Sequence, residues 1–175
     1  MQAVSHTSEK LNNYVYRRVV PQLYKVKKNL VDPGAFHILP IMRGLSVFRA
    51  DLASPYQVLQ ECINDQIERS ADPDEIKSEK ARIWLAKNPN VETLLNKDFR
   101  IVVLPINAIH ELGFSSFDGP EPNGHINILG THEMFIAQAE AFVELIDTGR
   151  ARILTVEECL QRTDANLEIV REDLI

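Results

Sequence analysis

The sequence has few cysteines and no long apolar run. Only Cys62 and Cys159 occur among 175 residues, and each lies in an apolar helical pattern that we interpret as core. Two isolated cysteines exclude a disulfide-stapled fold and are typical of a reducing compartment, so we expect a cytoplasmic protein. No apolar stretch approaches the ~18–20 residues that cross a bilayer, and the first residues lack a secretory signal, so no membrane association is expected.

The sequence also lacks the short motifs that identify common active sites. It contains no P-loop, no GxGxxG dinucleotide fingerprint, no GxSxG nucleophile elbow, and no HExxH or paired CxxC metal motif. The cofactor therefore stays unknown, and the motifs leave open whether the protein is an enzyme.

What is present is the composition of an ordinary globular domain. The chain is 45% hydrophobic and 25% charged, which is sufficient for a packed core. Its length matches one domain, so we expect a single globular domain over residues 1–175, in which residues 1–20 could form an N-terminal arm.

The charge is divided unevenly along the chain. Residues 1–50 carry eight basic and two acidic side chains, a net charge of +6, so residues 51–175 carry −12. The two parts either neutralise each other within one fold or leave a basic arm that contacts phosphate or the acidic body of another copy. Nucleic-acid binding is not expected, because the chain is acidic overall and its basic third lacks interleaved aromatic residues.

The first half of the chain mixes helical and strand signals. Apolar spacing predicts a helix from about residue 7 to residue 20. Residues 22–31 fit either a helix or a strand, because their apolar positions match both periods. Residues 35–41 and 45–49 are predicted as two short strands.

The second half gives clearer signals. Ser54 followed by Pro55 is a strong helix start, and the spacing after it predicts a helical insertion at about 55–97. The apolar, β-branched run at 99–104 predicts a strand that is buried on both faces. The later signals alternate: a short helix after Pro105, a strand at 125–129, a helix capped by Thr131 and ended by Gly149, a strand at 152–154, and a helix opened by Thr155. The predicted class is α+β, with a small mixed sheet covered by helices.

The richest cluster of polar residues lies at 115–133. Strand alternation places His125 and Asn127 on one face, which forms either a pocket wall or a wet surface. The helix start at Gly130-Thr131-His132 could hold a small anion on its unpaired N–H groups. His125 and His132 could also share a metal with nearby carboxylates, but the spacing matches no zinc signature, so no metal site is predicted.

One further segment resembles a motif of a known enzyme family. The segment Val47-Phe48-Arg49-Ala50-Asp51, followed by Ser54-Pro55 and Val58, resembles the first motif of the cholera-toxin-like ADP-ribosyltransferases. The resemblance implies that Arg49 holds NAD. It also implies that Ser115-Ser116 stands for the family's serine-rich motif and Gln138-Ala139-Glu140 for its Glu/Gln-x-Glu motif, with Glu140 catalytic. Without the resemblance, Arg49 and Asp51 are a strand-end ion pair.

Two hypotheses follow for function. The first is a small protein-binding or regulatory module that acts through a protein partner or by self-association. The alternative is an NAD- or nucleotide-using transferase, with Arg49 as anion clamp. Its remaining candidates are Ser116, Thr131 and His132 for ligand binding, and His125, Glu133 and Glu140 for catalysis. Whether Arg49 meets the 115–133 segment in space is the geometric question that separates them.

Overall fold

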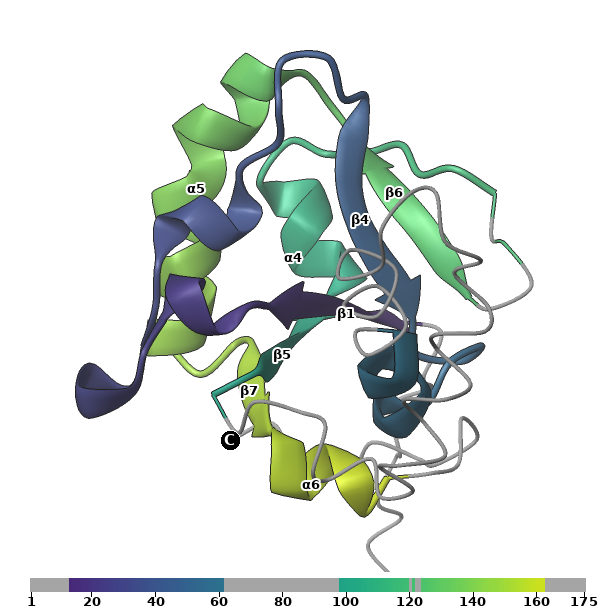
Figure 1. Cartoon of the computed structure of the whole chain (residues 1–175). Helices are drawn as coiled ribbons and strands as arrows, with labels where there is room; N and C mark the ends of the chain where they lie inside the picture. The colour runs from purple at the N-terminus through teal and green to yellow at the C-terminus, as the bar shows by residue number, and fades with distance from the viewer. Residues whose placement is uncertain (1–12, 62–97, 120, 122–123, 163–175) are drawn as a thin grey trace, which may run out of the picture.

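The computed structural model describes residues 13–61, 98–119, 121 and 124–162, and it has an α+β fold (Figure 1). The strands are β1 (Tyr14–Val19), β2 (Tyr24–Lys25), β3 (Leu30–Val31), β4 (Gly44–Arg49), β5 (Arg100–Pro105), β6 (His125–Leu129) and β7 (Arg152–Thr155). The α-helices are α4 (Ile106–Glu111), α5 (His132–Asp147) and α6 (Val156–Leu160), and residues 55–61 are also helical. Three short 3-10 helices are η2 (Pro21–Leu23), η3 (Val26–Lys28) and η4 (Pro33–Phe36).

Five of the strands form one sheet in the order β6-β4-β1-β5-β7, and β2 and β3 pair in a separate hairpin. Every pairing among these described strands is antiparallel, so the mixed sheet expected from the sequence is corrected in this respect. The α+β class itself is confirmed. Since β1 is the middle strand, residues 14–19 belong to the core of the fold and not to an N-terminal arm.

The helix predicted over residues 7–20 is wrong where the structure describes it, because residues 14–19 form β1. Val15 and Val19 pack on one face of the sheet, and Tyr14 and Tyr16 pack on the other. A strand that is buried on both faces loses its alternation of apolar and polar residues, and here the remaining apolar spacing imitates a helix. Residues 7–12 lie outside the described residues.

Two further segments before β4 are settled by the structure. The ambiguous residues 22–31 form the β2–β3 hairpin around η3, which ends at Asn29 with a φ of 51°. The strand predicted over 35–41 is wrong, because η4 occupies the start of this segment and the rest has no strand. The Asp32 side chain begins η4 by accepting a hydrogen bond of 2.8 Å from the Gly34 N–H.

Most other local predictions are confirmed. Strands occur at 45–49, 99–104, 125–129 and 152–154 to within a residue, and a short helix follows Pro105. Ser54 and Gln57 bond reciprocally through side chain and backbone at the start of the 55–61 helix. The remainder of the predicted insertion, from residue 62, lies outside the described residues, as does Cys62.

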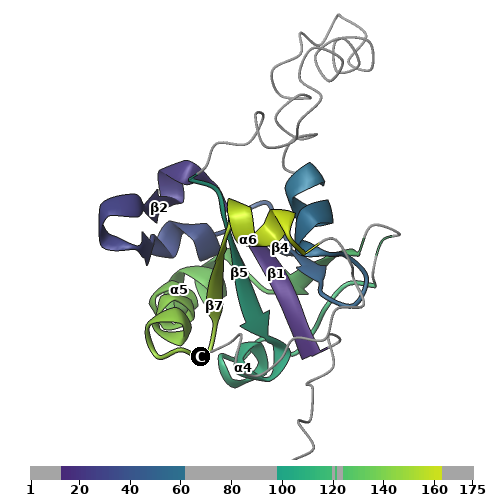
Figure 2. The same ribbon diagram turned by 90° about the horizontal axis from the view of Figure 1, so that it is seen from below.

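Helices cover both faces of the sheet (Figure 2). On one face, α4, α5 and η4 enclose an aromatic cluster in which Phe36 stacks on Phe142 at 4.8 Å between ring centroids and Phe114 stacks on Phe135 at 4.5 Å. On the other face, the 55–61 helix and α6 cover a second core that includes the buried Cys159. Within the described ranges, no helix has the length and apolar character needed to span a membrane.

Candidate functional site

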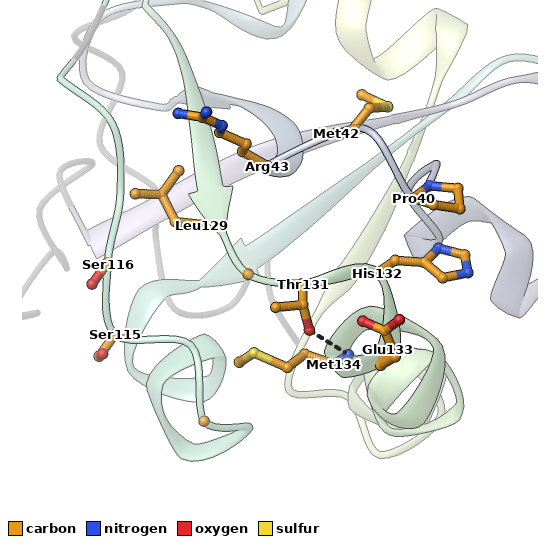
Figure 3. A pocket seen from close by; sticks show the side chains of 12 residues that line it. Pro40, Met42, Arg43, Ser115, Ser116, Leu129, Thr131, His132, Glu133 and Met134 are labelled. Atoms are coloured by element: carbon orange, nitrogen blue, oxygen red, sulfur yellow. Dashed lines mark hydrogen bonds between the residues drawn. The ribbon is translucent and has the colours of Figure 1, made fainter.

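A surface pocket of about 640 Å³ lies where β6 passes into α5 (Figure 3). We call it the α5 pocket. It is bounded by the start of α5, by the 113–116 segment and by the loop before β4. Its lining residues are Pro40, Met42, Arg43, Gly113, Ser115, Ser116, Leu129, Gly130, Thr131, His132, Glu133 and Met134.

The turn at the base of the pocket is closely packed because residue 130 is a glycine. A Cβ at this position would lie 2.9 Å from Phe114 Cε1 and 3.0 Å from Phe135 Cε2. The Gly130 N–H donates to the Arg43 carbonyl at 3.1 Å, and the Thr131 hydroxyl caps α5 by accepting from the Met134 N–H at 3.2 Å. The first turn of α5, with N–H groups that no helical carbonyl accepts, therefore forms part of the pocket wall.

The loop before β4 forms the opposite wall and exposes apolar side chains. Leu39 is 62% exposed, Ile41 88% and Met42 42%, whereas the neighbouring Ile38 is buried. We call residues 39–43 the rim loop. It is held at both ends, because the imidazole Nδ1 of His132 donates to the Ile38 carbonyl at 2.6 Å and the Gly130 N–H binds the Arg43 carbonyl.

The structure divides the candidate residues into separate groups. Ser116, Thr131, His132 and Glu133 line the α5 pocket, whereas Arg49, His125 and Glu140 do not. Gly44 pairs with Leu129 and Phe48 with His125, so the second group's Arg49 and His125 lie about 13 Å along the strands from the pocket. Glu140 is exposed on α5, about 10 Å along the helix from Glu133.

Arg49 meets the 115–133 segment through its backbone. Its N–H donates to the Gly124 carbonyl at 2.9 Å. Its guanidinium instead binds Asp51, with Nε to Oδ1 at 2.9 Å and Nη2 to Oδ2 at 2.5 Å, and both side chains are half-buried. The arrangement is the strand-end ion pair, a bidentate contact that orients the guanidinium toward its own carboxylate.

His125 lies in a second polar cluster on the β4–β6 face. Its Nε2 is 2.6 Å from Ser46 Oγ, and its Nδ1 is 3.6 Å from Glu121 Oε2. Asn127, directly opposite Ser46 in the sheet, donates its side-chain N–H to Asp118 Oδ2 at 2.8 Å. Sequence reasoning missed Ser46. The available signal was a lone hydroxyl in an apolar strand, but its partner is 79 residues away.

Neither the α5 pocket nor the polar cluster around Ser46 and His125 brings together a set of metal ligands. Across the part of the chain that the structure describes, no three His, Cys, Asp or Glu side chains form a group that could hold a metal ion. No protein-family model matches the chain, and no curated protein or solved structure matches it. The α5 pocket, the rim loop and the polar cluster around Ser46 and His125 are therefore the features from which a function is inferred.

Proposed function

We propose that the protein is a protein-binding or regulatory module whose contact surface is the rim loop together with the α5 pocket. The observation that carries this proposal is the exposure of three large apolar side chains, Leu39, Ile41 and Met42, within four residues. Scattered exposed apolar residues are normal on a soluble surface, whereas a contiguous apolar patch beside a pocket is typical of interaction sites.

The rim loop is suited to binding because it is held in place while its apolar side chains face solvent. Ile38 is buried beneath the loop, and the hydrogen bonds at Ile38 and Arg43 fix both its ends. A loop that is already ordered loses less entropy when a partner binds. Covering Ile41, which is 88% exposed, contributes up to about 1.5–3 kcal/mol, and covering the less exposed Leu39 and Met42 adds smaller amounts.

The lining of the pocket defines the chemistry of the partner. Met42, Leu129 and Met134 give the pocket an apolar lining, and flexible methionines adapt to the shape of an inserted side chain. Arg43, also in the rim loop, is exposed and forms no ion pair with any residue that the structure describes. The partner is therefore a protein segment, from another protein or a second copy, that presents an apolar side chain next to a carboxylate. We place this module in a reducing cytoplasm, because a sequence with only two isolated cysteines is typical of a reducing compartment.

Site-specific cross-linking tests the proposal. A photoreactive amino acid at position 41 is expected to give a discrete cross-linked product in cells, identified by mass spectrometry. The product should fall at least tenfold when Met42→Asp is added, because a carboxylate then occupies the apolar wall. The matched control is position 26, where Val26 is 51% exposed on the β2–β3 hairpin. Identical cross-linked products from positions 41 and 26 would contradict the proposal. A cross-linking yield that is unchanged by Met42→Asp would contradict it as well.

The transferase alternative requires Arg49 to clamp a nucleotide, and a small anion would use the start of α5. Both are tested by thermal shift with NAD and with inorganic phosphate, since a ligand at 100 times its Kd stabilises the fold by about 2.7 kcal/mol. We expect no shift with NAD, because Asp51 occupies the Arg49 guanidinium. A shift with NAD that disappears in Arg49→Ala would replace the protein-binding proposal by the transferase.

A further inference from the structure

The polar cluster on the β4–β6 face has the arrangement of an activated serine. Ser46 Oγ lies 2.6 Å from His125 Nε2, within hydrogen-bond range, and Glu121 Oε2 lies 3.6 Å from Nδ1 on the other side of the same ring. Nucleophilic serines on many unrelated folds have a hydroxyl within hydrogen-bond range of an imidazole and a carboxylate on the other side of the ring. The order of these residues in the chain is not relevant, because such sites are recognised by geometry.

The position of the carboxylate determines which ring nitrogen can act as a base. A carboxylate facing Nδ1 favours the tautomer with its proton on that nitrogen. The lone pair of Nε2 then points to Ser46, so the serine hydroxyl donates and the imidazole accepts. We propose that Ser46 is a nucleophile, that His125 is its general base, and that Glu121 is a positioning residue for the imidazole. The substrate class is a carboxylic ester or a similarly activated acyl group.

Asn127 supplies the remaining part of such a site. It is directly opposite Ser46 across the β4–β6 pair, on the same face of the sheet. A side-chain amide has two N–H donors, and one of them is held by Asp118 at 2.8 Å. The other N–H has no partner among the described residues, and we assign it to the oxygen of an acyl group at Ser46. Amide side chains stabilise the negative oxygen of acyl-transfer transition states in this way.

The cluster is held on rigid structure and is accessible. β4 is an interior strand between β6 and β1, so Ser46 cannot shift along the sheet without breaking two pairings. The His125 ring packs edge-on against Phe48 with 5.4 Å between centroids, which limits its rotation. The His125 side chain is still 23% exposed and Ser46 is half-buried, so neither residue is fully enclosed by the fold.

The reaction proceeds in two steps, acylation of Ser46 and hydrolysis of the acyl-enzyme. Ser46 Oγ attacks the carbonyl carbon while His125 Nε2 takes the hydroxyl proton, and the same proton passes to the departing alkoxide as the ester C–O bond breaks. The products are an acyl-Ser46 ester and an alcohol. Water then attacks the acyl carbon, gives one proton to His125, and releases the carboxylic acid as that proton returns to Ser46.

A fluorophosphonate probe tests the nucleophile directly in the full-length protein. Its phosphorus forms a bond to Ser46 Oγ, fluoride leaves, and the serine proton passes to His125. Peptide mass mapping of the unaltered chain is expected to place the adduct on Ser46 and not on Ser115, an exposed serine without a histidine partner among the described residues. Ser46→Ala should abolish labelling, and His125→Gln should slow it by at least about a hundredfold, the usual contribution of a general base.

Two variants of Glu121 separate a charge effect from a structural one. Glu121→Gln keeps the shape and loses the charge, so we expect labelling to slow by about fivefold, because an exposed ion pair has only a modest effect. Glu121→Asp keeps the charge and should retain more of the rate than Glu121→Gln. The opposite ranking would show that Glu121 acts through shape alone and would overturn its role as a positioning residue for the imidazole.

The labelling experiments also give clear outcomes for the role of Ser46 as a nucleophile. No adduct on Ser46 under conditions that label a reference serine hydrolase would overturn the proposal, as would equal labelling rates in wild type and a folded His125→Gln variant. Hydrolysis of a p-nitrophenyl ester that is lost in Ser46→Ala would support it. Because the rim loop and its partner play no part in these assays, the outcome is independent of the protein-binding proposal.

Discussion

Replacing Gly130 by alanine tests how tightly the turn between β6 and α5 is packed beneath the α5 pocket. The new Cβ would lie 2.9 Å from Phe114 Cε1 and 3.0 Å from Phe135 Cε2, distances that real Cβ atoms rarely show. The two rings are stacked at 4.5 Å and are almost completely buried, so neither can move away easily. The turn itself must therefore shift, or the aromatic pair must separate.

The size of the effect follows from two opposing contributions. Overpacking a close-packed core costs about 1–3 kcal/mol of unfolding free energy. Replacing glycine with alanine also lowers the conformational entropy of the unfolded chain, which raises the free energy of unfolding by about 0.4–1 kcal/mol. The net expectation is a loss of about 1–2 kcal/mol, and for a chain of this length that lowers Tm by roughly 3–6 °C.

Urea unfolding followed by circular dichroism measures this loss, with Gly119→Ala as the matched control. A Cβ at Gly119 meets no heavy atom within 4 Å, so the control should equal or slightly exceed wild-type stability. In a Phe114→Leu background, Gly130→Ala should cost less, because the smaller side chain leaves room for the methyl group. A Gly130→Ala protein as stable as wild type, with an unchanged m-value, would refute the packing argument.

Two further predictions concern the core and α6. Phe142→Ala should lower the free energy of unfolding by about 3–5 kcal/mol, because the ring is fully buried and stacks on Phe36; a loss below 1 kcal/mol in urea titrations would contradict this. Although burial alone raises the pKa of Glu158, hydrogen bonds from the Thr155 N–H and from Arg152 lower it below the ordinary 4.5. A lowered pKa in the folded state means that Glu158 stabilises the fold above pH 4.5 and that this contribution is lost as the pH falls through the folded-state pKa. Thermal unfolding of Glu158→Gln should therefore show a weaker loss of stability below pH 4.5 than wild type, and parallel curves would contradict the role of Glu158.

Several parts of the fold were predictable because they depend on neighbouring residues. Thr155 and Glu158 bond reciprocally as a capping box, and Thr131 caps α5, because the spacing of side chain and N–H is set by the helix itself. Gly149 ends α5 in a left-handed conformation with a φ of 75°, which only glycine adopts without cost. The strand at 99–104 was recognisable from its continuous β-branched run.

The candidate site was predictable only in part. The 115–133 segment was recognised from the sequence as rich in polar groups, and seven of its residues line the α5 pocket: Ser115, Ser116, Leu129, Gly130, Thr131, His132 and Glu133. The rim loop was missed because its apolar residues imitate a buried strand, and exposure is not readable from residue type. Ser46 was missed because the residue that makes it interesting is on another strand.

The sequence by itself determined the helix caps, most strand positions and the α+β class, since each depends on contacts within a few residues. Only the tertiary structure decided that residues 14–19 form the central strand, because burial on both faces removes the alternation from which a strand is recognised. Strand pairing likewise decided that the His125 ring lies within hydrogen-bond range of Ser46 and that Arg49 lies at the end of β4 away from the pocket. These contacts depend on register between distant segments, and a side-chain period of two residues carries no information about which strand lies alongside.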